Sequence, residues 1–444
     1  MAEKGKLKIQ CFKGDTYIPV DGSKAILTPA QGQEGETKEV ILSTNSSGES
    51  DVIELAAPPI SYSQEPSSNL PYSLYDLKVE RDGFEVLLIK GIQVFPEQVA
   101  LQQCNLLEAS VRRSSRADII SINPNTLNGN YAPKIPEEVD KPLPPPTGGV
   151  VLSKPIVPEF ITVHEGSPDN DSAPNFTVLY KDYIKNVASC EIYSTWSEST
   201  IRSNVYAIIS FTLNRIYTEW YRGKGKRYDI TNSTAYDHAF NYGRNIYESI
   251  SVIVDDIFST YVRRFGRKQP LLTQYCDGKN VQCPGWMTQW GSKYLGDEGK
   301  TPYEILKSFY GSDIELVKAE VVKGSPKSYP GYDLTVGSSG EEVKTIQQQL
   351  NRISDNYPLI PKLAVDGVFS NKTEEAVKVF QGVFNLPKTG IVDYATWYKI
   401  SDVFVGVTKI AELRGDANKK LFIPPRSFDI LNDSNVPTFN YYDY

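Results

Sequence analysis

The sequence predicts a multidomain protein with a β-sandwich at the front, an α+β domain in the middle and a small three-helix domain near the end. Three observations support this prediction. The chain has 444 residues, more than one hydrophobic core usually serves. Its apolar residues alternate in the first part and follow a helical period in the middle and last parts. Stretches rich in proline or glycine separate the parts, and the expected boundaries are 1–110, 111–149, 150–325, 332–402 and 403–444.

The composition excludes several classes of protein. Hydrophobic residues make up 40% and charged residues 23% of the chain, as in ordinary globular domains. The formal net charge of -7, without a long basic block, argues against a nucleic-acid partner. No apolar run approaches the roughly 18 residues of a membrane span. The start of the chain has no apolar stretch with a cleavage site, so we expect no export by the usual signal.

The first 110 residues predict a small β-sandwich. Short strand patterns are separated by turn residues, as in sandwich domains. No cluster of catalytic residue types occurs in this region. The predicted strands lie at 6–11, 17–20, 51–55, 75–80 and 84–89.

Residues 111–158 predict a segment that builds no core of its own. Eight prolines lie between Pro133 and Pro158, and two adjacent glycines follow at 148–149. Such a segment is expected to be extended, exposed and open to proteases. It is either a plain linker or a region where the chain is processed.

The middle part predicts two long helices among loop-rich stretches. Thr195 and Glu198 have the spacing of a capping box at the start of the first helix. The apolar positions of this helix are 201, 205, 208, 216 and 220, and those of the second helix are 246, 250, 254, 257 and 261.

The predicted three-helix domain resembles the peptidoglycan-binding domain of many cell-wall hydrolases. Apolar residues fall on one face of each of two helices, and glycines mark the turns between helices. The resemblance covers residues 332–402 and implies peptidoglycan as a partner. It is carried by 334–340, Val343, Ile346, Leu350, 365–369, Thr373, 376–377, 380–381, 389–393 and 396–397.

The middle part resembles the catalytic domain of the SpoIID/LytB family. One part of the match is the stretch 187–192, followed by Trp196 and the helix from 199 to 217. The more specific part is Met-Thr-Gln-Trp-Gly at 287–291, followed by a glycine and an Ile-Leu helix. Members of this family are lytic transglycosylases that cut glycan strands between N-acetylmuramic acid and N-acetylglucosamine.

The order of the parts resembles the spore cortex-lytic enzymes of clostridia. This resemblance implies a precursor, made in the mother cell, that lies in the cortex or coat region of the spore. It also implies activation near Gly149 and Val150 by a subtilisin-like germination protease, with cortex peptidoglycan as the substrate and no cofactor.

Glu191 is the candidate catalytic residue. Glycoside cleavage requires an acid that protonates the leaving oxygen, and most glycosidases add a second carboxylate. A lytic transglycosylase needs only one, because the same group can later take the proton of the muramoyl 6-hydroxyl. Glu191 follows the apolar residues 187–188 and precedes Ile192, a setting that would exclude water. The competing interpretation is a solvated loop glutamate.

Four residues are candidates for substrate binding: Gln289, Trp290, Tyr275 and Trp196. An amide can bond sugar hydroxyls, and an indole can stack on a pyranose ring. The alternative for the pair at 289–290 is a packing motif that holds the Gly291 turn. Asp277 and Ser292 are weaker candidates.

The cysteines and histidines indicate no metal site. Cys276 and Cys283 could form half of one, but neither His164 nor His238 has a spacing that completes it. We expect free or paired thiols and no metal. Cys190 has no neighbouring histidine to act as its base, which argues against a cysteine nucleophile. Two other functions stay open: a non-catalytic wall-binding spore protein, and an enzyme that hydrolyses the same glycan or its peptide stems.

Overall fold

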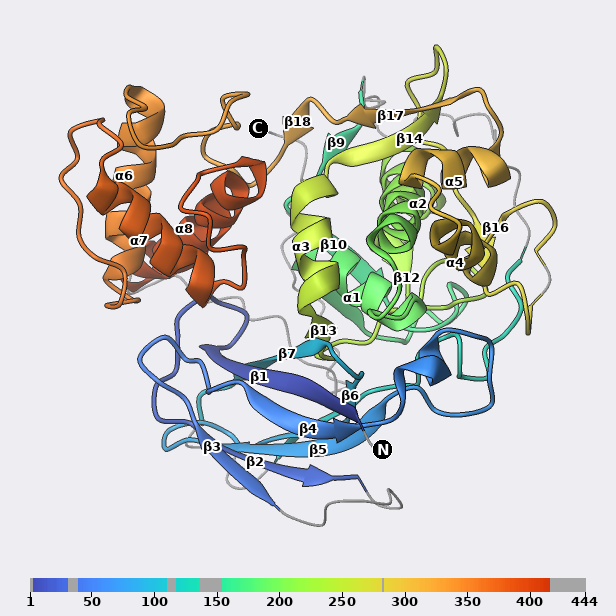
Figure 1. Cartoon of the computed structure of the whole chain (residues 1–444), viewed down its shortest axis with the longest axis horizontal. Coiled ribbons are helices and arrows are strands. Elements are labelled where there is room, and N and C mark those ends of the chain that lie inside the picture. Colours follow the sequence, from blue (N-terminus) through green and yellow to red (C-terminus); the bar gives the residue numbers. More distant parts are fainter. Residues whose placement is uncertain (1–2, 31–38, 110–116, 136–153, 282, 416–444) are drawn as a thin grey trace.

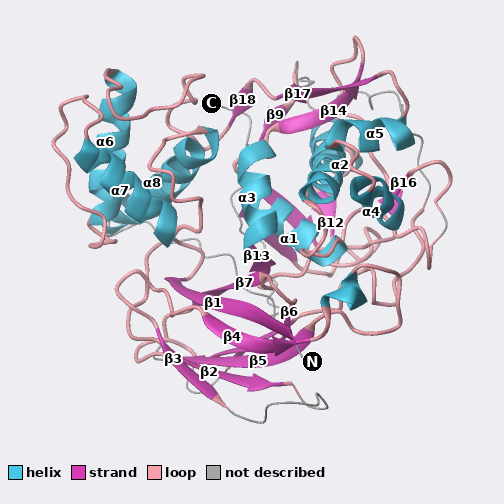
Figure 2. Cartoon of the chain, viewed as in Figure 1, coloured by secondary structure: helices cyan, strands magenta, loops and turns pink. Residues whose placement is uncertain are grey.

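The computed structural model describes residues 3–30, 39–109, 117–135, 154–281 and 283–415, the last seven by their backbone alone. It is a mixed α/β molecule of several parts (Figure 1). Strands form the front part, helices and short strands the middle part, and three helices the last part (Figure 2). In the described residues no helix combines the length and apolar character needed to cross a membrane.

The front part contains two sheets that share a hydrophobic core. One has the order β13-β7-β1-β4 and the other β3-β2-β5-β6-β8. Alternating residues are buried, among them Leu7 and Ile9 of β1 and Leu77 and Val79 of β5. The strands are β1 (Glu3–Lys13), β2 (Lys24–Pro29), β3 (Val40–Ser43), β4 (Ile53–Ala57), β5 (Ser73–Glu80), β6 (Leu87–Val94), β7 (Val99–Leu106) and β8 (Asp118–Ser121), and a short 3-10 helix, η1 (Ile60–Ser63), precedes β5.

The segment expected to be an exposed linker is partly built into this fold. Strand β8 pairs in parallel with β6, from Leu87 opposite Asp118 to Lys90 opposite Ser121. Asn125 and Leu127, further along, are buried. The described residues 117–135 build no core of their own; they join the edge of an existing sheet and cover the middle part.

The middle part is organised around helix α2 (Glu198–Tyr217), which is buried on most of its faces. Helices α1, α3, α4 and α5 all contact α2. They span Tyr180–Glu191, Glu248–Ile257, Gln289–Asp297 and Pro302–Tyr310. The short strands are β9 (Ile156–Val157), β10 (Phe160–His164), β11 (Asn175–Leu179), β12 (Ile230–Thr231), β13 (Ile246–Tyr247), β14 (Thr260–Arg264), β15 (Tyr275–Cys276), β16 (Met287–Thr288), β17 (Ile314–Lys318) and β18 (Val321–Val322), and a 3-10 helix, η2, spans Arg222–Lys224.

Two predicted features of these helices are wrong. The cap of α2 is Ser197, whose side chain accepts from the backbone N–H of Thr200, whereas the Thr195 hydroxyl bonds to another part of the chain. The second predicted helix is shorter, because Ile246 lies in β13, which pairs with β7 of the front sheet. Tyr261 likewise lies in β14, so tertiary pairing overrides the helical spacing at both ends.

The last part consists of α6 (Glu341–Ser354), α7 (Asn371–Val383) and α8 (Tyr394–Gly415). The buried faces of α6 and α7 contain the predicted apolar residues, including Val343, Leu350 and Phe380. Helix α8 continues past 402 into the range expected to be a C-terminal tail, because Val403 and Val407 keep facing the core. Residues 416–444 lie outside the described chain.

The front part also contacts the last part directly. The Gln10 side chain donates to the carbonyl of Val383 at 3.0 Å, and Lys8 donates to the Asn385 side chain at 2.9 Å. Tyr17 is buried at the same contact. Its ring packs against Phe384 with centroids 6.2 Å apart, and its carbonyl accepts from the Tyr357 hydroxyl. The front part therefore rests on both of the parts that follow it in the chain.

Candidate functional site

Glu191 is the last residue of α1 and is only 3% exposed. Helix α1 ends there because Ile192 adopts an extended backbone. The negative end of the helix dipole disfavours a charged carboxylate at this position, but three donors offset this. Oε1 accepts from the backbone N–H of Ala239 at 2.8 Å. Oε2 lies 3.1 Å from the Gln289 amide nitrogen and 3.2 Å from the Thr126 hydroxyl.

Gln289 supports Glu191 from the start of α4. Thr288 caps this helix by accepting from the N–H of Gly291 at 3.1 Å. The Gln289 amide nitrogen donates to the main-chain carbonyl of Glu191 at 2.9 Å as well as to its carboxylate. Gln289 is 1% exposed, so its amide orients the acid. The geometry also fits the alternative in which residues 289–290 hold the Gly291 turn. The packing there is tight, because a Cβ at Gly291 would lie 2.2 Å from the Thr288 hydroxyl.

The backbone donor at Ala239 depends on a buried ion pair. Arg215 on α2 lies 2.7 Å from Asp237, and both side chains are at most 1% exposed. The other Asp237 oxygen accepts from the N–H and the hydroxyl of Thr231 at 2.9 and 2.7 Å and from Tyr221 at 2.7 Å. Such a fully bonded pair holds a loop in one conformation. It thereby keeps the N–H of Ala239 directed at Glu191.

Glu191 opens into a cavity of about 330 Å³. Half of its wall comes from the middle part of the chain and half from residues 126–134, which precede that part. Of the predicted site residues, Glu191, Gln289 and the weaker candidate Asp277 line it. The other lining residues are Thr126, Asn128, Gly129, Asn130, Tyr131, Ala132, Lys134, Thr234, Cys276, Asp277, Asn280 and Val281.

We call residues 123–135 the strap, since they run across this cavity. The backbone N–H of Thr126 donates to the carbonyl of Cys190 at 2.9 Å. The Asn125 side chain donates to the carbonyls of Ser189 and Ile192 at 3.3 and 3.2 Å. At its other end, Lys134 donates to the carbonyl of Asp237 at 2.9 Å. The strap thus binds the chain on both sides of the acid.

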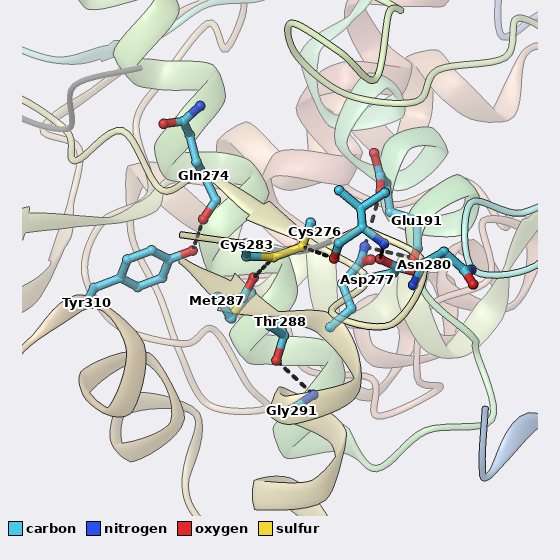
Figure 3. Close-up of a disulfide and its surroundings, with 12 residues drawn as sticks. Glu191, Gln274, Cys276, Asp277, Asn280, Cys283, Met287, Thr288, Gly291 and Tyr310 are labelled. Carbon is cyan, nitrogen blue, oxygen red and sulfur yellow. Dashed lines mark hydrogen bonds between the residues drawn. A yellow bond between two sulfur atoms is a disulfide. The ribbon is translucent and has the colours of Figure 1, made fainter. Parts of the chain in front are cut away.

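A disulfide between Cys276 and Cys283 closes the loop that forms one wall of the cavity (Figure 3). Of the two expected states, free or paired thiols, the structure has the pair. The Asp277 carboxylate accepts from the N–H groups of Asn280 and Val281 at 2.7 and 2.8 Å. It therefore shapes the loop. Among the described residues, no group of three or more His, Cys, Asp or Glu side chains could hold a metal ion.

Tyr275 lies beneath the cavity and is fully buried. Among the described residues its hydroxyl has no hydrogen-bond partner, and burial raises the pKa of this phenol well above the ordinary value. Lys134 of the strap lies over its ring at 4.2 Å. Tyr275 was predicted to bind substrate. It is not part of the cavity lining, and its ring instead lies beneath Lys134, which is.

The other nucleophile and base candidates are unsuited to catalysis. Burial lowers the pKa of His238 well below the ordinary value, so this ring is neutral. His164 is buried elsewhere, stacked on Tyr228, with Nδ1 2.9 Å from Asn175. Burial raises the pKa of the Cys190 thiol, which disfavours the reactive thiolate.

The structure places Trp196 and Trp290 beside the cavity, outside its lining. Their rings contact each other at 5.1 Å, and both contact Tyr193, at 5.5 and 5.9 Å. The predicted processing residues Gly149 and Val150 lie outside the described residues. Sequence reasoning missed Thr126, Lys134 and the N–H of Ala239, because no local pattern marks a residue that meets Glu191 only through the fold.

Comparison with known proteins identifies one part of the chain. Residues 339–400 match the family model of a peptidoglycan binding domain. No curated protein matches the chain. This match covers α6, α7 and the start of α8, and it supports association of the protein with the cell wall and peptidoglycan as a partner.

Similarity to solved structures is slight. The TIE protein of Bacillus anthracis is 19% identical over 24% of this chain and 17% of its own, with a TM-score of 0.16. The 3-chlorocatechol 1,2-dioxygenase of Rhodococcus opacus is 7% identical over 24% of this chain and 61% of its own, with a TM-score of 0.18. The chain thus spans less than two thirds of either structure.

Proposed function

We propose that this protein, which carries a peptidoglycan-binding domain, is a lytic transglycosylase of the spore cortex that is made as an inactive precursor. One observation supports this most directly. A buried glutamate at the end of α1 faces a cavity and is oriented by Gln289 and by the N–H of Ala239. Among the described lining residues, the other carboxylate is that of Asp277, which is bonded within its own loop.

The proposed mechanism uses Glu191 twice. In its protonated form it donates to the glycosidic oxygen that links N-acetylmuramic acid to N-acetylglucosamine, and the bond from C1 to that oxygen breaks. Its carboxylate then takes the proton of the muramoyl 6-hydroxyl, whose oxygen forms a new bond to C1. The products are a 1,6-anhydromuramoyl end and a free N-acetylglucosamine 4-hydroxyl. The acid is restored without water.

The strap is the reason for proposing a precursor. Thr126 bonds to the catalytic carboxylate and Lys134 lies over the cavity floor, so a glycan strand has no access to Glu191. Both residues precede the expected cleavage region near Gly149 and Val150. A subtilisin-like germination protease that cuts there would separate the strap from the middle part. Deposition around the spore by the mother cell would keep the precursor at its substrate.

Product analysis tests the proposal. A recognition site for a specific protease is inserted between residues 149 and 150, and the full chain is assayed on decoated spores before and after cleavage. We expect cortex lysis only after cleavage, with 1,6-anhydro ends detected by mass spectrometry. Reducing ends would instead identify a hydrolase. Equal rates before and after cleavage would contradict the precursor.

The second candidate is a non-catalytic wall-binding protein of the spore. It is favoured by the match of the last part alone to a known family. This function predicts binding to cortex without release of soluble fragments, in the cleaved and the uncleaved chain alike.

A further inference from the structure

A row of polar groups follows Glu191 directly, and each is bonded by a residue from the front of the chain. The Tyr193 hydroxyl donates to the Asn128 side chain. The Thr195 hydroxyl donates to the Ser63 hydroxyl at 2.8 Å, and the Trp196 indole N–H donates to the Ser63 carbonyl at 2.9 Å. Ser63 ends η1, the short helix of the front part that lies near α4 in Figure 2.

Aromatic rings accompany this row. Tyr193, Trp196 and Trp290 form the cluster described above, and Phe95 of the front part packs against Tyr193 with ring centroids 5.3 Å apart. Ser194, between two of these residues, has a buried hydroxyl without a hydrogen-bond partner. The front part therefore meets the cluster with one ring and three acceptor groups.

All of these covering groups precede residue 149. If the front of the chain leaves after cleavage, three donors lose their partners and the ring cluster loses its cover. Water would hydrate the freed donors, whereas the exposed aromatic surface would stay without a partner and favour a ligand. A ligand that combines an apolar ring face with oxygen acceptors would restore both kinds of contact.

We propose that Tyr193, Thr195, Trp196 and Trp290 form a saccharide subsite beside Glu191, and that Ser63, Phe95 and Asn128 occupy it in the precursor. The C–H face of a pyranose packs on aromatic rings, and its hydroxyl, ether and acetamido oxygens accept hydrogen bonds. The four side chains are uncharged, so they offer hydrogen bonds and ring faces to a sugar but no ion pair to the carboxylates of a peptide stem. This inference rests on the proposed function, because it assigns part of that enzyme's substrate site.

Binding is measured in the Glu191→Gln background, so that no cleavage occurs. The chain with the inserted protease site is cut and titrated calorimetrically with a soluble tetrasaccharide of alternating N-acetylglucosamine and N-acetylmuramic acid. Thr195→Val removes the hydroxyl donor and keeps the shape of the side chain, and Trp196→Phe removes the indole N–H and keeps an aromatic ring. We expect each to weaken binding about tenfold, the effect of one lost hydrogen bond of about 1.4 kcal/mol. The uncut chain should lack this binding and show only what its peptidoglycan-binding domain contributes.

Trp397→Phe is the matched control. Its indole N–H also donates to a carbonyl, that of Lys327 at 3.1 Å, but in the peptidoglycan-binding domain. Unchanged binding in both test variants, or equal weakening in the control, would overturn the subsite. Equal binding by cut and uncut chains would overturn its occupation by the front part. Activity of the cut chain with Glu191 intact, and its loss in Glu191→Gln, tests the proposed function separately.

Discussion

Among single substitutions, we expect replacement of Glu191 to reduce catalytic activity the most. In Glu191→Gln the amide oxygen can still accept from Ala239, so the fold should persist. The variant cannot protonate a leaving oxygen, and general acid–base catalysis typically contributes about 10²- to 10⁴-fold. We therefore expect loss of cortex lysis by the cleaved enzyme, measured as release of soluble muropeptides.

Two controls separate catalysis from folding in this variant. Its thermal unfolding and its binding to insoluble peptidoglycan should equal those of the parent protein. Persistent clearing of cortex by the purified, cleaved variant would show that Glu191 is not the acid.

Gln289 is expected to act through Glu191. Gln289→Leu keeps the volume of the side chain but removes the donor to the carboxylate at 3.1 Å. Without this hydrogen bond the carboxylate is less well oriented toward the leaving oxygen. We expect kcat to fall about tenfold or more while KM for a soluble glycan stays the same. A rise in KM with unchanged kcat would instead indicate direct contact with substrate.

At the scale of elements, the site is assembled where the ends of several segments meet. Helix α1 ends at the acid, α4 begins at its amide donor, and the loop before β13 supplies a backbone N–H. The strap covers their meeting point with both backbone and side-chain bonds. The strap is short and is held mainly by local hydrogen bonds, so it can be removed without unfolding the elements beneath it. This property suits a segment that is released by a single cleavage.

The helical domain at the end of the chain has a separable role. Removing 332–415, which takes all of α8, should weaken binding to insoluble peptidoglycan and lower activity on intact cortex. Activity of the cleaved form on short soluble glycans should be retained, since this domain lines no part of the cavity. Cosedimentation with purified cortex and a soluble-glycan assay measure the two effects. Full retention of cortex binding would contradict the role assigned to this domain.

At the scale of the whole molecule, the front part holds the two later parts together. The two later parts also contact each other directly, since Lys181 of α1 pairs with Asp402 of α8, beside the pair of Lys185 and Asp255 within the middle part. Burial raises the pKa of Asp402 and of Tyr17, which also lies near the carboxylates of Asp182 and Asp402. The phenol therefore stays protonated and acts as an anchor between domains.

Tyr17→Ala tests this anchor in the uncut chain. Truncating a buried aromatic residue typically costs about 3–5 kcal/mol, here at the contact with Phe384 and Tyr357. We expect faster hydrogen exchange of the amides around 357 and 384 and faster proteolysis between the domains. Tyr332→Ala, at a side chain that is 54% exposed, is the control and should leave both rates unchanged. Equal protection in Tyr17→Ala would mean that the contact contributes little.

The sequence alone determined the features that depend on local pattern. Apolar spacing identified α2, α6 and α7, because a helix that packs on a core must place apolar residues on one face. Turn residues and alternation identified strands of the front part. Glu191 and Gln289 stood out through the resemblance to the SpoIID/LytB family, and the structure brings the two into contact across 98 residues.

Only the tertiary structure decided what covers the acid. The contact of Thr126 with Glu191, the Ser63 bonds to Thr195 and Trp196, and the direction of the Ala239 N–H join positions that no sequence period connects. The same holds for Ile246, whose helical spacing gives way to pairing with β7. Periodicity records which face of an element is buried, whereas the partner of that face depends on how the whole chain closes. The strap was therefore predicted as a linker, although its residues complete the candidate site.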